Sequence, residues 1–202
     1  MGIKYSVYQA ISLSELCRHV DLALKPAKMQ SFFHKETHMP DTALPTGITP
    51  EIIEAFWREA ANATYASGKK PEDNEDGSKT HRYEDSEHGL WYEDNWHSVN
   101  GYGFGTTLIG HIEAGVVWFM QYHGPSCREV TEGLKMALRH ALTMEEFLGC
   151  RGPGKYVPMA PYGYFNAVVG SFSNFTGRET IYKESSLLHT HIYHGYLLVA
   201  QN

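Results

Sequence analysis

Three histidines near the end of the sequence have the spacing that most directly suggests chemistry. They are His189, His191 and His194. Because side chains alternate between the two faces of a β-strand, His189 and His191 share one face and His194 lies on the other. Two imidazoles need a third protein ligand to hold zinc, and either Glu179 or Tyr193 could complete such a site. The pattern is incomplete on the histidines alone, so we predict no metal and no cofactor.

A Tyr-His-Gly tripeptide occurs twice, at residues 122–124 and 193–195. Paired histidines can serve as the general base and general acid of a phosphoesterase. Enzymes of that kind carry Ser or Thr two positions after each histidine, and neither His123 nor His194 is followed in this way. As catalytic residues of a hydrolase, the candidates are His194 and His123 with the carboxylate of Glu179.

Glu179 lies in a predicted strand, where a charged side chain needs solvent or a partner. It could bind the ribose hydroxyls or an amine of a ligand. It could equally pair with an arginine such as Arg178 or Arg151.

Strand alternation also predicts two matching rows of side chains. One strand places Trp118, Met120 and Tyr122 on a single face, and a later strand does the same with His189, His191 and Tyr193. If the two strands meet, these six residues would line a pocket able to stack a planar ring and to donate hydrogen bonds to phosphate or carbonyl. The alternative is a half-buried antiparallel sheet with a histidine-rich solvent face.

The rest of the sequence indicates which elements hold these residues. A helix begins at Thr49, whose side chain can cap it, with Pro50 in its first position. A second helix begins at Ser126, and Glu129 completes its capping box. Alternating or continuous apolar residues predict strands in six segments: 89–97, 105–112, 116–123, 162–169, 177–183 and 187–199.

The order of helix, strands and hairpin thus occurs twice. A shift of 71 positions aligns the two Tyr-His-Gly tripeptides and also Phe104 with Phe175. We therefore predict an α+β fold, an internally duplicated unit of a helix plus antiparallel β-strands, with an N-terminal helical arm. The predicted boundaries are an arm and linker over 1–48 and a duplicated domain over 49–202, with repeat one at 49–124 and repeat two at 125–202.

Several segments together resemble a known family. They are residues 63–68, Phe104, residues 117–124, 151–153 and 175–181, and the final Tyr-His-Gly. This chain resembles a bacterial domain-of-unknown-function family, number 5680, over residues 52–199. The resemblance implies a shared fold and brings no agreed activity. Where repeat two has Phe175, Gly177 and Glu179, repeat one has Phe104, Thr106 and Leu108, so the carboxylate of that pattern occurs once.

The composition excludes some classes of protein. The chain has 202 residues and a net charge of −6, whereas a protein that binds duplex nucleic acid needs a basic stripe. No apolar run approaches the ~20 residues that span a bilayer, and no secretory signal begins the sequence. The three cysteines form no Cys-x-x-Cys pair and suit a reducing compartment. We predict a cytoplasmic protein without membrane contact.

The leading functional hypothesis is the binding of a small nucleotide-derived or aromatic ligand, for sensing or sequestering a signal in a bacterium or a phage. It is favoured by the high aromatic content, 13%, and by the two matching rows of side chains. One alternative is a hydrolase acting on such a ligand. Another is an interaction or inhibitor module that contacts a protein partner through residues 1–48. A homodimer is compatible with each of these.

Overall fold

The computed structural model describes five segments of the chain: residues 43–126, 132–142, 149–152, 157–159 and 161–198. The predicted helical arm falls on residues 1–42 and lies outside them. Residues 43–48, the end of the predicted linker, are described, and Leu44 and Ile48 pack against the core. No helix in the described segments is both long and apolar enough to cross a membrane.

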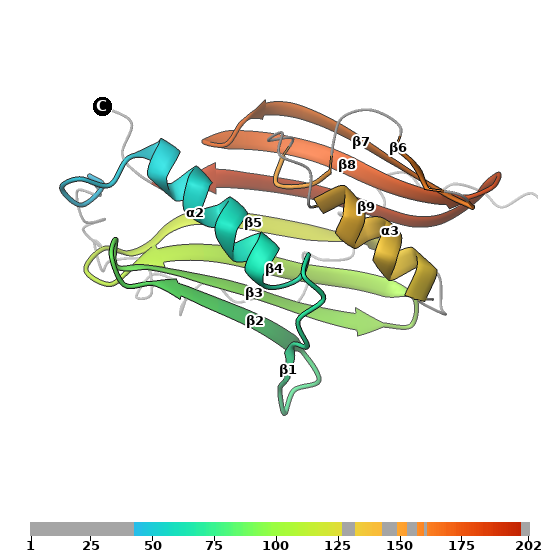
Figure 1. Cartoon of the computed structure of the whole chain (residues 1–202), viewed down its shortest axis with the longest axis horizontal. Helices are drawn as coiled ribbons and strands as arrows, with labels where there is room; N and C mark the ends of the chain where they lie inside the picture. Colours follow the sequence, from blue (N-terminus) through green and yellow to red (C-terminus); the bar gives the residue numbers. More distant parts are fainter. Residues whose placement is uncertain (1–42, 127–131, 143–148, 153–156, 160, 199–202) are drawn as a thin grey trace, which may run out of the picture. The chain divides into compact units, whose positions relative to one another are not determined.

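Nine antiparallel strands form one continuous sheet (Figure 1). In spatial order they run β1-β2-β3-β4-β5-β9-β8-β7-β6, so consecutive strands pair except where β5 meets β9. Their bounds are β1 Glu72–Asp73, β2 Lys79–Asp85, β3 Leu90–Val99, β4 Tyr102–His111, β5 Gly115–Pro125, β6 Val157–Met159, β7 Tyr162–Ser171, β8 Asn174–Lys183 and β9 Ser186–Leu197.

Two helices, α2 (Pro50–Ala63) and α3 (Glu132–Leu142), cover the same face of this sheet (Figure 1). Thr49 caps α2, and its hydroxyl accepts a hydrogen bond from the Ile52 amide. The buried face of α2 consists of Ile53, Phe56, Trp57 and Ala60. It packs toward β2 and β3, whereas α3 packs its Leu134, Ala137 and Ala141 toward β7 and β8. Each helix therefore buries one apolar stripe against the sheet.

The predicted α+β fold of duplicated helix-plus-strand units is wrong. The described chain is mainly β, with a single sheet and two helices lying on one face of it. The physical reason is the pairing of β5 with β9, which joins the early and late strands edge to edge. Neither helix closes a separate unit, because both bury their apolar stripes on the common sheet.

The core lies between α2 and the middle of the sheet. Trp118, Phe175 and Tyr193 are at its centre and are buried almost completely. The Trp118 ring stacks on Phe172 with 5.1 Å between ring centroids, and its indole nitrogen donates a hydrogen bond to the Phe172 carbonyl oxygen at 3.1 Å. A second, smaller cluster joins α3 to Tyr164 and Ile181 of β7 and β8.

Candidate functional site

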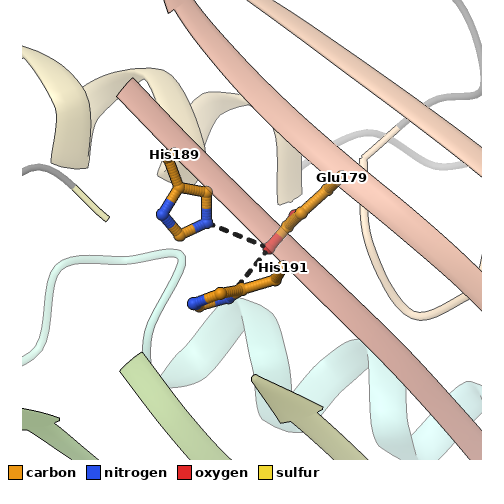
Figure 2. Close-up of side chains that lie close together, drawn as sticks. All are labelled: Glu179, His189 and His191. Atoms are coloured by element: carbon orange, nitrogen blue, oxygen red, sulfur yellow. Dashed lines mark ion pairs between the residues drawn. The ribbon is translucent and has the colours of Figure 1, made fainter. Parts of the chain in front are cut away.

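A carboxylate and two imidazoles meet on the helix-covered face of the sheet. Glu179 of β8 and His191 of β9 are register partners, so their side chains project from the same face. His189 lies two residues earlier on β9 and projects alongside. One carboxylate oxygen, Glu179 Oε1, is 3.5 Å from His189 Nε2 and 3.4 Å from His191 Nδ1, as Figure 2 shows. All three side chains are buried, Glu179 completely.

Glu179 is ionised in this setting despite its burial. Burial alone would raise the pKa of Glu179, but the positive charge of the Arg151 guanidinium holds it well below its usual value. Arg151 Nη1 is 3.7 Å from Glu179 Oε1. The second oxygen, Oε2, accepts a hydrogen bond from the Tyr164 hydroxyl at 3.0 Å. Of the two arginines considered from the sequence, Arg151 is therefore the partner, and Arg178 is exposed on the opposite face.

The Arg151 side chain lies against two tyrosine rings, and hydrogen bonds fix the backbone of the residue that follows it. Its guanidinium carbon lies 4.5 Å from the ring centroid of Tyr122 and 5.7 Å from that of Tyr193. The next residue, Gly152, is fixed to β7, because its amide donates to the Tyr164 hydroxyl and its carbonyl accepts from the Asn166 amide group. This segment therefore presents a charged side chain at a defined position without belonging to a helix or a strand.

Several buried polar atoms of this cluster have no hydrogen-bond partner among the described residues: Arg151 Nε and Nη2, Glu179 Oε1, His189 Nε2, and both ring nitrogens of His191. A buried polar atom without a partner costs about 1–3 kcal/mol, so natural proteins contain few of them. Their concentration in one place indicates a site built to bind a further group.

A cavity of about 850 Å³ opens beside the cluster, within the size range of small-molecule sites. Arg151, His189 and His191 line it, and most of its other lining residues come from α2 and the segment that follows it, from α3, and from strands β2 to β5 with the turn between β3 and β4. Its charged lining residues are mostly basic, with one acidic residue, Asp94, against five basic ones: Lys69, Lys79, Lys135, Arg139 and Arg151. Carboxylates outside the lining partly neutralise this excess, because Lys79 pairs with Asp73, Lys135 with Glu132 and Arg151 with Glu179.

Aromatic rings form another part of the cavity wall. The rings of Trp96, Tyr65 and His81 contact one another. Between ring centroids, Trp96 is 6.2 Å from Tyr65 and 5.3 Å from His81, and Tyr65 is 6.3 Å from His81. Burial, reinforced by the charges of Lys69 and Arg139, lowers the pKa of His81 to about 4. His81 is therefore a neutral aromatic group at physiological pH.

Asp94 supplies a buried acceptor in the same cavity. Its Oδ1 accepts hydrogen bonds from the Thr107 hydroxyl and from the Tyr122 hydroxyl, both at 2.9 Å. Burial raises the pKa of Asp94, and Arg151 opposes this change. These contacts fix the Tyr122 ring beneath the Arg151 guanidinium.

The structure brings together some of the residues predicted from strand alternation and separates others. Met120, Tyr122, His189 and His191 line the cavity. Trp118 and Tyr193 share their face but belong to the buried core, where the Tyr193 hydroxyl donates to Asn166 Oδ1 at 2.6 Å. Strands β5 and β9 pair, and the six side chains share one face of the sheet as alternation predicts. Alternation does not predict which of them lie in the core and which line the cavity.

The three candidate catalytic residues do not converge. Glu179 projects from the helix-covered face, whereas His123 and His194 project from the opposite face of β5 and β9. His123 is exposed and His194 half-buried. In place of these two, the imidazoles next to Glu179 are those of His189 and His191.

Sequence reasoning missed Trp96, His81, Asp94 and Arg139 as cavity residues. Asp94 and Trp96 alternate along β3 with residues of the other face, so strand alternation was the available signal. Arg139 lies on α3 among helix-surface residues, and no pattern separates it from a solvated arginine.

The chain was also compared with known proteins. Residues 103–198 match a family model described as Domain of unknown function (DUF5680). This segment is similar to the domains of that family. The family resemblance inferred from the sequence is thereby confirmed, with a match that begins at β4. The DUF5680 segment contains Arg151, Glu179, His189 and His191, whereas Tyr65, His81, Asp94 and Trp96 precede it. No curated protein and no solved structure matches the chain.

Proposed function

We propose that this protein binds a small anionic ligand that carries a planar ring, such as a nucleotide-derived compound, in the cavity beside Arg151. The observation that carries the proposal is Arg151, which lines the cavity and whose guanidinium atoms Nε and Nη2 are buried without a hydrogen-bond partner among the described residues. A guanidinium offers paired donors in a fork that matches phosphate and carboxylate oxygens. The excess of basic residues around the cavity supports an anion as the bound group.

The aromatic wall supports a ring on the ligand. Trp96, Tyr65 and His81 present ring surfaces to the cavity, and nucleobases bind well against such faces. Asp94 places a buried acceptor on the same side, suited to an amino group of a base. Retention of such a compound, as a sensor or a sink for a signal in the cytoplasm of a bacterium or during phage infection, is the biological role we propose.

This geometry does not support the hydrolase alternative, because Glu179 lies on one face of the sheet and His123 and His194 lie on the other. The interaction-module alternative depends on residues 1–48, most of which lie outside the described segments. We therefore carry binding forward as the single proposed function.

The test is a retention experiment with the full chain. Purified protein is incubated with a panel of nucleotides, cyclic dinucleotides and ADP-ribose compounds, and mass spectrometry compares the filtrate with what heating releases from the protein. We expect one or more intact compounds only in the heat-released fraction, and a reduced amount from Trp96→Leu. A panel that stays entirely in the filtrate contradicts the proposal, and a new mass in the filtrate indicates turnover instead.

A further inference from the structure

Three side-chain atoms beside the cavity have the spacing of metal ligands. Glu179 Oε1 lies 3.4 Å from His191 Nδ1 and 3.5 Å from His189 Nε2, and all three ligand atoms lie within 4.8 Å of one another. In a tetrahedral zinc site with bonds of roughly 2.0–2.1 Å, neighbouring ligand atoms are separated by roughly 3.3–3.4 Å. In an octahedral site with bonds of similar length the separation is about 3.0 Å. The two distances from Glu179 Oε1 are therefore closer to those of a tetrahedral site.

A hydrogen-bonded explanation fits these atoms less well. A hydrogen bond from an imidazole to a carboxylate is usually about 2.7–3.2 Å long, and both contacts are longer than that. None of the three atoms has a hydrogen-bond partner among the described residues, although all are buried. Lone pairs that converge at this spacing, away from water, are the arrangement that a metal ion requires.

Two of the three ligand residues, Glu179 and His189, are held by other residues through their second polar atom. The Tyr164 hydroxyl donates to Glu179 Oε2, which leaves Oε1 for the metal. His189 Nδ1 contacts the Ser126 hydroxyl at 3.3 Å, which leaves Nε2 for the metal. Metal sites in proteins characteristically fix their ligands through such outer hydrogen bonds.

We propose that Glu179, His189 and His191 form a binding site for a divalent transition metal, with Zn²⁺ as the best fit. Two histidines and one glutamate are a known zinc ligand set that keeps a fourth position open. His189 and His191 also line the cavity, so a water or a ligand atom from the cavity can take that position. The metal site stands independently of the anion-binding function proposed above.

Arg151 is the charge that opposes a cation here, since its Nη1 is 3.7 Å from Glu179 Oε1. Its guanidinium carbon also lies 4.5 Å from the ring centroid of Tyr122, a contact that stabilises the cation. An anion in the cavity would offset the positive charges of Arg151 and of the metal ion.

The test measures zinc affinity with untagged, chelator-stripped full-length protein. Competition against a chromophoric zinc chelator should give one Zn²⁺ per chain, and the Co²⁺ form should show the strong visible absorption of tetrahedral cobalt. His189→Gln, His191→Gln and Glu179→Gln should each weaken zinc binding by about 100-fold or more, and Tyr164→Phe by about 10–100-fold. Matched controls are His194→Gln and His123→Gln on the opposite face, which should bind zinc like the wild type.

Circular dichroism of the metal-free variants shows whether each one folds. If a ligand variant does not fold, Tyr164→Phe still tests the site, because it keeps all three ligands. The proposal is overturned if the wild-type protein takes up no zinc in competition with the chromophoric chelator. It is also overturned if His194→Gln weakens binding as much as His191→Gln, or if Co²⁺ gives only the weak spectrum of an octahedral ion.

Discussion

Tyr122 of β5 and Tyr193 of β9 are register partners across the one junction that joins the early strands to the late ones. The Arg151 guanidinium lies against both rings, at 4.5 and 5.7 Å from their centroids. Through this junction the Tyr122 ring of β5 comes to lie 5.5 Å, between ring centroids, from the His191 ring of β9. The candidate site is therefore a product of strand pairing between segments far apart in the sequence.

The hydroxyl of Tyr122 should matter for stability. It donates to the buried Asp94 carboxylate, so Tyr122→Phe leaves a buried acceptor with one bond fewer. We expect a loss of about 1–3 kcal/mol in the free energy of unfolding, measured by urea denaturation. Tyr196→Phe on the exposed face of β9 is the control and should change stability little. Equal stabilities for the two variants would contradict this account of Asp94.

Trp118 and Trp96 should behave in opposite ways. Trp118 is completely buried against Phe172 and Phe175, so Trp118→Ala should lower the free energy of unfolding by about 3–5 kcal/mol. Trp96 lines the cavity and is partly exposed, so Trp96→Leu should mainly reduce ligand retention. Chemical denaturation and the retention experiment, run on both variants, distinguish these roles. A retention defect in a folded Trp118 variant equal to that of Trp96→Leu would contradict the assignment.

His81 should make stability depend on pH. Its pKa is about 4 in the folded protein, against about 6.5 in the unfolded chain, because burial and then Lys69 and Arg139 disfavour the charged ring. The unfolded chain binds the proton first as pH falls, so this contribution to stability is present above pH ~6.5 and is lost between about 6.5 and 4. His81→Phe should flatten the stability profile in that window.

The measurement is the free energy of unfolding at a series of pH values for the wild type and His81→Phe, with NMR following the His81 ring. A His81 ring that titrates near its usual value in the folded protein would refute the prediction, as would identical pH profiles for the two proteins.

Much of the local structure could be predicted from the sequence, because it depends on neighbouring residues. Thr49 and Pro50 mark the start of α2, and strand alternation places Tyr122, His189 and His191 on faces that prove to be common. Alternation does not reveal depth, however, and Trp118 lies in the core because α2 covers the middle of the sheet.

The remaining features depend on contacts between distant segments. Glu179 meets His191 through the register of β8 on β9, and that register shifts at a bulge between Ile181 and Tyr182. Arg151 follows Cys150 in an irregular segment, where no periodicity predicts the direction of a side chain. The fold class was predicted wrongly for the same reason, since helix and strand patterns do not show that all nine strands share one sheet.

The central claim is that Arg151 binds an anionic ligand in the cavity. The most direct measurement compares Arg151→Lys with Arg178→Lys, which makes the same change on the exposed face of β8, for any compound retained by the wild type. Lysine keeps the charge but loses the paired donors of the guanidinium. We predict a loss of retention of about tenfold or more for Arg151→Lys and wild-type retention for Arg178→Lys. Equal retention by the two folded variants would contradict the claim.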